Sequence, residues 1–269
     1  MNTLGSNKKL FYLNGVPRAG NTLFASLLNQ NPDVAVTANS IVMHILKEVY
    51  MTRDTLVFKN YPDYRSLNNV YQNILKNYYE HWPHKYIIER SPVYTPGNQI
   101  LLKEANQPIK CIILWRDVID ILASFIKWFE NEPSAYPNTD ESFYGKTIES
   151  KLKGLMSVDG IIARSLDSIK EALRPENINN CHILRYDDLI KNPEEEIMKV
   201  YSFLEIPFFN HNYKSLEQFS VNGLGYDDQS GKIGKDLHTI RTNGIYKEDN
   251  SYRSMVPQYF LDAYGHITL

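Results

Sequence analysis

Short apolar runs alternate with helical patterns along this chain, and this alternation is the strongest constraint on its fold. The runs cover residues 8–16, 31–37, 85–89, 109–115 and 181–186. Strands that alternate with helices over connections of this length indicate an α/β fold with a P-loop-like, doubly wound parallel sheet flanked by helices. The chain length suits a single domain over 1–269, in which the loop-rich segment 210–269 closes the site.

Apolar residues recur at helical spacing between the predicted strands. They predict helices over residues 40–51, 67–79, 146–173, 194–204 and 257–265. Thr95 and Pro96 suit the N-cap and the first position of a further helix. The stretch 118–129 is apolar nearly all round, so we expect it to be buried beneath other layers.

The sequence GVPRAGNT connects the first predicted strand to the first helix and is close to a phosphate-binding P-loop. Gly15, Gly20 and Thr22 keep the spacing of the pattern G-x-x-x-x-G-K-[ST], in which backbone N–H groups surround phosphates. Asn21 replaces the lysine of that pattern, and Arg18 brings a cation inside the loop instead. Strand, loop and helix follow one another in the required order, which strengthens the prediction of an anion site.

Arginines follow four of the predicted strands: Arg18, Arg90, Arg116 and Arg185. In a doubly wound sheet, ligands bind at the carboxyl ends of the strands. The planar guanidinium pairs with two oxygens of a phosphate or sulfate at once, so this arrangement predicts a polyanionic ligand. Asp117 follows Arg116 directly and suits a helix N-cap better than a catalytic role.

Composition excludes several classes of protein. A net charge of -2 lacks the basic excess that general nucleic-acid binding needs. No apolar run approaches the roughly 18 residues of a membrane-spanning helix, and the N-terminus lacks the apolar core of a secretion signal, so we expect a cytoplasmic protein without stable membrane insertion. Cys111 and Cys181 lie in apolar strands and predict neither a disulfide framework nor a metal site.

Motifs between residues 10 and 205 resemble those of the sulfotransferases that use 3'-phosphoadenosine 5'-phosphosulfate (PAPS). IILWRDVIDILASF is similar to the 3'-phosphate motif, in which a serine, here Ser124, stands eight residues after the arginine, here Arg116. GVPRAGNTLFASLLNQNPDV resembles the 5'-phosphosulfate loop of tyrosylprotein sulfotransferases and their bacterial relatives, with matches at Pro17, Arg18, Gly20, Thr22, Leu23, Pro32, Asp33 and Val34.

Two further stretches carry the resemblance. IIERSPVY resembles the E-K-[ST]-P-x-Y stretch of carbohydrate sulfotransferases, with Arg90 in place of the lysine. LRYDDLIKNPEEEI resembles a Y-E-D-L-x-x-x-P segment whose tyrosine, here Tyr186, lies near the adenine. The resemblance implies an enzyme that takes PAPS as co-substrate and needs no metal.

The resemblance also implies a role for each matched residue in an in-line transfer of the sulfuryl group. Arg116 and Ser124 would bind the 3'-phosphate, and Arg241 offers a further contact to it. Arg18 and Arg90 would stabilise the charge that builds on the bridging oxygen. The 5'-phosphosulfate would be held by the loop residues Arg18, Ala19, Gly20, Asn21, Thr22 and Leu23.

This chain departs from the tyrosylprotein enzymes at the general base. Their glutamate, twenty-one residues after the loop arginine, corresponds to Asn39 here, and Ile41 and Ile45 occupy positions that are basic in those enzymes. Protein tyrosine is therefore not the expected acceptor. His44 and Glu89 remain as candidate bases, and we rank His44 first because histidine accepts protons near neutral pH. A lone histidine in an apolar helix is, however, more often packed than catalytic.

The acceptor is less constrained than the donor. The aromatic, mildly acidic stretch 128–145 is expected to help form the acceptor pocket, and the expected acceptor is a small molecule, a glycan or a lipid. Two other functions stay open. A kinase-like phosphoryl transferase would need the missing loop lysine and magnesium, and a PAPS-binding module that has lost its base would bind the nucleotide without transfer.

Overall fold

Five parallel strands form one sheet in the order β2-β3-β1-β4-β5. The computed structural model describes residues 8–38, 40–134, 145–228, 237–245 and 251–269. Because the chain moves outward from the central β1 in both directions, the sheet has the doubly wound topology predicted from the sequence. The strands are β1 (Lys9–Gly15), β2 (Val34–Val36), β3 (Tyr86–Arg90), β4 (Cys111–Trp115) and β5 (Cys181–Arg185).

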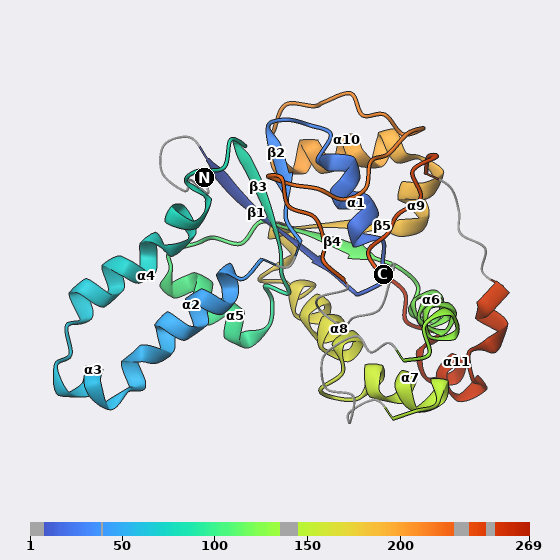
Figure 1. Cartoon of the computed structure of the whole chain (residues 1–269), viewed down its shortest axis with the longest axis horizontal. Helices are drawn as coiled ribbons and strands as arrows, with labels where there is room; N and C mark the ends of the chain where they lie inside the picture. The colour runs from blue at the N-terminus through green and yellow to red at the C-terminus, as the bar shows by residue number, and fades with distance from the viewer. Residues whose placement is uncertain (1–7, 39, 135–144, 229–236, 246–250) are drawn as a thin grey trace.

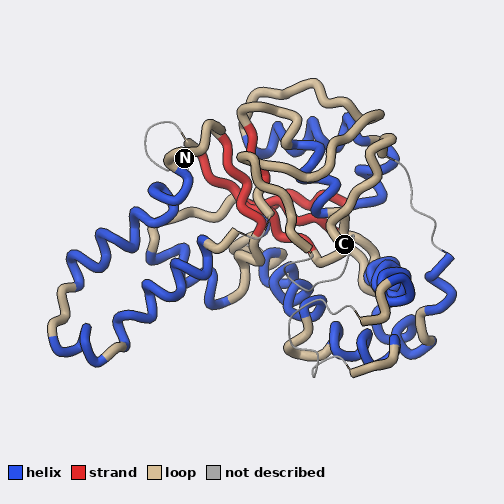
Figure 2. The backbone as a smooth tube through the Cα atoms, in the orientation of Figure 1, coloured by secondary structure: helices blue, strands red, loops and turns tan. Residues whose placement is uncertain are grey.

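Helices cover both faces of the sheet (Figures 1 and 2). A buried hydrogen bond of 3.0 Å from the Asn14 amide to the Ser168 hydroxyl ties helix α8 to the central strand. The same figures place α1 (Asn21–Leu28), α9 (Tyr186–Lys191) and α10 (Pro193–Leu204) on one side, and α5 (Pro96–Glu104) and α8 (Ile161–Ala172) on the other. The helices thus bury the strands from two sides.

The other helices form two groups at opposite ends of the molecule (Figure 1). One group projects as an arm and comprises α2 (Val42–Met51), η1 (Thr52–Asp54), α3 (Leu56–Asn60) and α4 (Tyr64–Tyr79). The other comprises α6 (Val118–Asn131), α7 (Ile148–Met156), η4 (Ser251–Met255) and α11 (Gln258–Tyr264), while the short η3 (Ile178–Asn180) leads into β5.

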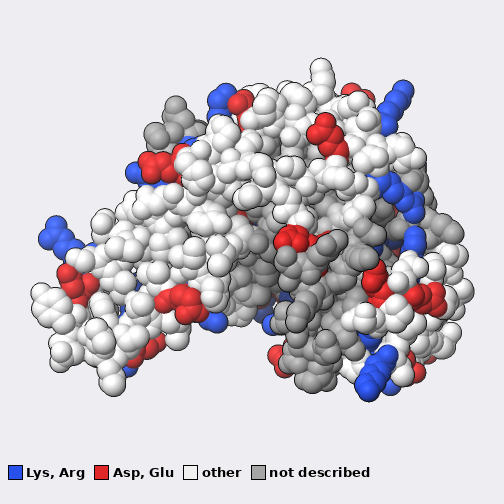
Figure 3. Space-filling view, in the orientation of Figure 1, with Lys and Arg blue, Asp and Glu red and all other residues white. Residues whose placement is uncertain are grey.

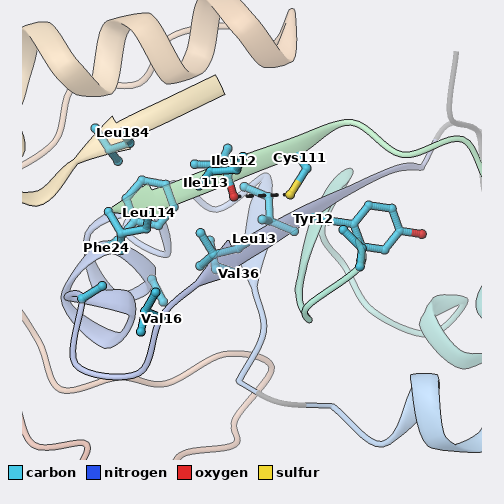
Figure 4. Close-up of a cluster of buried hydrophobic side chains, with 14 of the residues drawn as sticks. Tyr12, Leu13, Val16, Phe24, Val36, Cys111, Ile112, Ile113, Leu114 and Leu184 are labelled. Carbon is cyan, nitrogen blue, oxygen red and sulfur yellow. Dashed lines mark hydrogen bonds between the residues drawn. The ribbon is translucent and has the colours of Figure 1, made fainter. Parts of the chain in front are cut away.

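The core lies between the sheet and the helices that cover it (Figure 4). Leu13 and Leu114 of neighbouring strands and Phe24 of α1 are fully buried. Strands covered on both faces carry apolar residues in succession rather than in alternation, which explains the run CIILW in β4. This core supplies a rigid platform for the loops at the carboxyl ends of the strands.

The helix predicted over residues 146–173 is two helices, so that prediction was wrong. The chain turns between α7 and α8, and a Cβ atom added at Gly160 would lie 2.2 Å from the carbonyl oxygen of Leu155. The sequence SVDG before α8 is a turn signal. Regular leucine and isoleucine spacing continues on both sides because both helices bury an apolar face. The turn brings the beginning of α8 to the site described below.

Side-chain caps fix the predicted helix starts. Thr95 accepts a hydrogen bond from the Asn98 N–H, and Pro96 occupies the first position of α5. Asp117 accepts hydrogen bonds from the N–H groups at the start of α6, which confirms its role as an N-cap.

In the described part of the chain, no helix has both the length and the apolar character for crossing a bilayer. Acidic and basic side chains are interspersed over the face in Figure 3.

Candidate functional site

A cavity of about 640 Å³ lies at the carboxyl ends of the strands. Its size falls within the roughly 300–1,000 Å³ of small-molecule sites. Most residues predicted from the sequence meet here, although the four motifs that contain them are far apart in the chain. The predicted residues in its lining are Arg18, Gly20, Asn21, Thr22, Leu23, Arg90, Arg116, Ser124, Tyr186 and Arg241.

Asn21, which replaces the P-loop lysine, holds the loop closed. Its side-chain amide donates a hydrogen bond of 2.8 Å to the Val16 carbonyl, and the residue is only 3% exposed. A Cβ atom at Gly15 would lie 1.9 Å from Asn21 Oδ1, so this packing requires glycine. Asn21 therefore contributes to the shape of the loop, while the cation that a P-loop lysine would supply comes from elsewhere.

Arg18 supplies a cation from within the loop. Its backbone has a φ of 68°, in the left-handed region that a non-glycine residue enters at a cost of about 1–2 kcal/mol. Its guanidinium Nε donates to Ser124 Oγ at 3.0 Å, and Nη1 donates to the Leu237 carbonyl at 2.8 Å. Arg18 thus joins the loop to helix α6 and to the C-terminal segment.

Arg116 joins the loop to a third motif. Its Nη1 donates to the Arg18 carbonyl at 3.0 Å, and its guanidinium lies 4.6 Å from the centre of the Tyr186 ring, within cation–π distance. Tyr186 in turn covers Gly20, where a Cβ atom would lie 2.6 Å from the ring. Three motifs that the sequence presents separately are therefore one packed unit.

Arg90 links the cavity to the C-terminal segment. Its Nη1 donates to the Tyr226 hydroxyl at 2.7 Å. The Tyr226 ring stacks on His238 with a centroid distance of 3.7 Å and an interplanar angle of 3°. His238 Nδ1 lies 2.6 Å from Asp228 Oδ1, and its backbone N–H donates to Asp228 Oδ2 at 3.0 Å. The C-terminal segment therefore adds a histidine to the cavity lining, together with a carboxylate that holds this histidine.

The charge around His238 affects its protonation. Burial lowers the pKa of His238, and the nearby charges of Arg90 and Arg18 lower that pKa further. The hydrogen bond and the charge of Asp228 act in the opposite direction. The net pKa lies below 6.5, so the imidazole is neutral at pH 7.

The two candidate bases chosen from the sequence are not brought into the cavity. His44 lies on α2 with its side chain 63% exposed, 3.9 Å from Glu48, and does not line the cavity. Glu89 is fully buried below Arg90, because successive side chains of a strand point to opposite faces. Asn39 and the part of the expected acceptor pocket at 135–144 lie outside the described residues.

Hydroxyl groups enclose the Glu89 carboxylate. Thr37 donates to it at 2.7 Å and Ser40 at 2.8 Å, and Tyr79 donates a third hydrogen bond. Burial raises the pKa of Glu89, and these hydrogen bonds oppose that shift. Its contacts suit a role in holding the ends of β2 and β3 together.

Ala19 is also fully buried, and its backbone N–H donates to the Val16 carbonyl within the loop.

Sequence reasoning missed two groups of lining residues. Arg164 and Ser165 come from α8 and reach the cavity because the chain turns before that helix. The C-terminal segment contributes His238 next to the predicted Arg241, together with Leu237, Thr239, Ile240, Gly244 and Ile245. The loop-rich composition of 210–269 predicted a segment that closes the site, but within it the sequence indicated only Arg241 as a contact residue.

Known proteins match both the sequence and the fold. The family model described as "Sulfotransferase domain" matches residues 11–224. "Cytosolic sulfotransferase 7" of Arabidopsis thaliana is 28% identical over 109 residues, which are 40% of this chain. The match spans about a third of the length of that relative, 32%.

Two solved structures share the fold at low sequence identity. The "Sulfotransferase Domain from the Curacin Biosynthetic Pathway" has a TM-score of 0.54 and 17% identity, covering 98% of this chain and 92% of that one. The "Sulfotransferase Domain from the Synechococcus PCC 7002 Olefin Synthase" has a TM-score of 0.52 and 14% identity, covering 100% of this chain and 92% of that one. With the family model matching more than half of its residues, this chain belongs to the sulfotransferase domain family.

Proposed function

We propose that this chain transfers the sulfuryl group of PAPS to a hydroxyl or amine group of a small molecule, glycan or lipid. The observation that carries the proposal is the packed unit of Arg18, Arg116, Ser124 and Tyr186 at one cavity. Family membership supports the reaction type. The cavity volume of about 640 Å³ lies within the range of small-molecule and cofactor sites.

The donor set suits a nucleotide with anionic groups at two ends. The loop ends at the N-terminus of helix α1, where free backbone N–H groups favour an anion such as the 5'-phosphosulfate. Arg116 and Ser124 would bind the 3'-phosphate, with Arg241 as a further contact. Tyr186 would contact the adenine. PAPS supplies an activated sulfuryl group when bound, and Arg18 and Arg90 would stabilise the charge that develops on the bridging oxygen.

Calorimetry with 3',5'-adenosine bisphosphate (PAP), the expected product, tests the binding part. We expect magnesium-independent binding that Arg116→Ala weakens by about 10- to 100-fold, since hydrogen bonds to charged groups contribute about 1.5–3 kcal/mol. Arg185→Ala is the matched control, because Arg185 ends the neighbouring strand but is exposed and does not line the cavity. Binding of ATP with magnesium but not of PAP would overturn the proposal and favour a kinase-like enzyme.

Transfer is tested separately with ³⁵S-labelled PAPS and a panel of phenols, sugars and lipid alcohols. Labelled product that forms with the wild-type chain and disappears in Arg90→Ala supports the proposal. Tight PAP binding without release of labelled sulfate or product under any condition would instead identify a nucleotide-binding module.

A further inference from the structure

We propose that His238, oriented by Asp228, is the general base that removes the proton from the acceptor. The inference rests on the proposed function and names a residue for it. Both residues lie beyond the stretch 11–224 that matches the family model, so the geometry of this chain carries the assignment. His238 lines the same cavity as Arg18 and Arg90.

Three contacts fix the His238 ring. Asp228 holds its Nδ1 at 2.6 Å and also accepts the His238 backbone N–H at 3.0 Å. Tyr226 stacks on one face of the ring, with planes 3° apart. The Tyr226 hydroxyl accepts a hydrogen bond of 2.7 Å from Arg90. Tyr226 therefore links the His238 ring to Arg90 at the end of β3. Arg90 is the residue proposed to stabilise the charge that develops during transfer.

The carboxylate of Asp228 selects the tautomer. An ionised carboxylate only accepts hydrogen bonds, so the Nδ1 of His238 must carry the proton that they share. Nε2 is then the ring nitrogen with a free lone pair. A histidine held in this way by a carboxylate is a recurring arrangement for proton transfer.

The charged groups that face His238 favour the neutral ring at pH 7. Arg90 and Arg18 disfavour a second positive charge, burial acts in the same direction, and Asp228 partly compensates. A neutral imidazole whose Nδ1 is held by a carboxylate matches the requirement for a general base, which must be unprotonated yet able to bind a proton.

The transfer step then balances. The acceptor O–H gives its proton to His238 Nε2 while the acceptor oxygen forms a bond to sulfur. The bond between sulfur and the bridging oxygen breaks, and its electron pair leaves with the 3',5'-bisphosphate. The imidazolium that results is stabilised by the carboxylate of Asp228.

Kinetics of His238→Gln and Asp228→Asn test the assignment, with His266→Gln as the matched control because His266 is exposed near the C-terminus. His238→Gln should lower kcat by about 10²-fold or more, the usual contribution of a general base, and should remove the loss of rate at acid pH. Asp228→Asn should lower kcat and move that loss to lower pH, because the carboxylate raises the pKa of His238. Unchanged kcat and pH profile in His238→Gln, or a loss confined to His44→Gln, would overturn the assignment.

A second measurement needs no acceptor. In the PAP-bound wild-type chain labelled with ¹⁵N at histidine, nitrogen shifts report the tautomer of His238. We expect a proton on Nδ1 and none on Nε2 at pH 7, and the signal is assigned by its absence in His238→Gln. A proton on Nε2 would overturn the proposal. Failure of the wild-type chain to bind PAP would overturn the proposed function itself. Normal PAP binding and normal transfer by His238→Gln would overturn only the assignment of His238 as the general base.

Discussion

The Arg116 guanidinium donates a hydrogen bond to the backbone carbonyl of Arg18, 3.0 Å away. The residue expected to bind the 3'-phosphate therefore also holds the loop expected to bind the 5'-phosphosulfate. Tyr186 completes the connection by packing on both Arg116 and Gly20. In the proposed function, recognition of the two ends of the nucleotide would thus be coupled through direct contacts between these residues.

This coupling predicts how Arg116 affects discrimination between nucleotides. The wild-type chain should bind PAP more tightly than adenosine 5'-monophosphate by about 10- to 100-fold, since only PAP offers a 3'-phosphate to the guanidinium. Arg116→Ala should reduce this ratio, leaving the share contributed by Ser124 and Arg241, and should also weaken binding of the monophosphate, because the loop loses its support. Calorimetric titration with both nucleotides measures the ratio. An intact ratio in Arg116→Ala would show that other residues bind the 3'-phosphate.

Asn21→Ala should destabilise the loop. Removal of the amide takes one of two donors from the Val16 carbonyl, which keeps its hydrogen bond from the Ala19 N–H, so the free energy of unfolding should fall by about 0.5–1.5 kcal/mol. Urea unfolding measures this cost, and PAP binding should weaken with it. Asn21→Lys should not confer ATP binding, because the side chain at this position is buried and bonds to the backbone of the loop itself. Gain of ATP binding in Asn21→Lys would contradict this interpretation of the loop.

Gly20→Ala should destabilise the loop where Tyr186 packs on it. The φ of 94° costs a residue with a Cβ atom about 1–2 kcal/mol, and the new atom would lie 2.6 Å from the Tyr186 ring. Gly97→Ala is the matched control, since that glycine in the first turn of α5 has no atom within 4 Å of an added Cβ, so this substitution should cause no loss of stability. Urea unfolding of both variants gives the comparison. Equal stability of the two would rule out close packing at Gly20.

His211 should make the fold less stable at acid pH. Burial lowers its pKa from 6.5 to about 4. The unfolded chain binds a proton at His211 below pH 6.5, whereas the folded chain does so only near pH 4, so stability falls as pH falls between these values. From pH 7 to 5 the loss is about 2 kcal/mol. Urea unfolding at both pH values should show this loss in the wild-type chain and a smaller one in His211→Gln.

The fold was predictable because local patterns agree with the global arrangement. The buried run CIILW, the N-cap Asp117 and the proline at the start of α5 each have a local physical cause. The meeting of Arg90 and Arg116 at one cavity was predictable for a related reason: both stand at strand ends, and parallel topology brings such ends together.

The proposed base His238 was not predictable in the same way. His44 satisfied the local pattern of an apolar helix, but α2 belongs to the arm and presents it to solvent. His238 lies in a segment without regular secondary structure, and its partners Tyr226 and Asp228 meet it through loop geometry. Periodicity carries no information about such contacts. The position of Arg164 at the cavity depends on the turn between α7 and α8, which the regular apolar spacing of residues 146–173 does not reveal.

Arg90 and Tyr226 allow the transfer step to be separated from nucleotide binding. Arg90→Ala should lower kcat by about 10²-fold, as expected for loss of a donor to the charge that develops in the transition state. Tyr226→Phe removes the 2.7 Å hydrogen bond and retains the ring that stacks on His238, so kcat should fall by roughly 10-fold or less. PAP affinity should change by less than kcat in both variants, because the proposed contacts of Arg90 strengthen only during transfer. Parallel measurement of the PAP dissociation constant and of kcat decides the matter: equal losses in the two quantities would make Arg90 a nucleotide-binding residue and remove it from the transfer step.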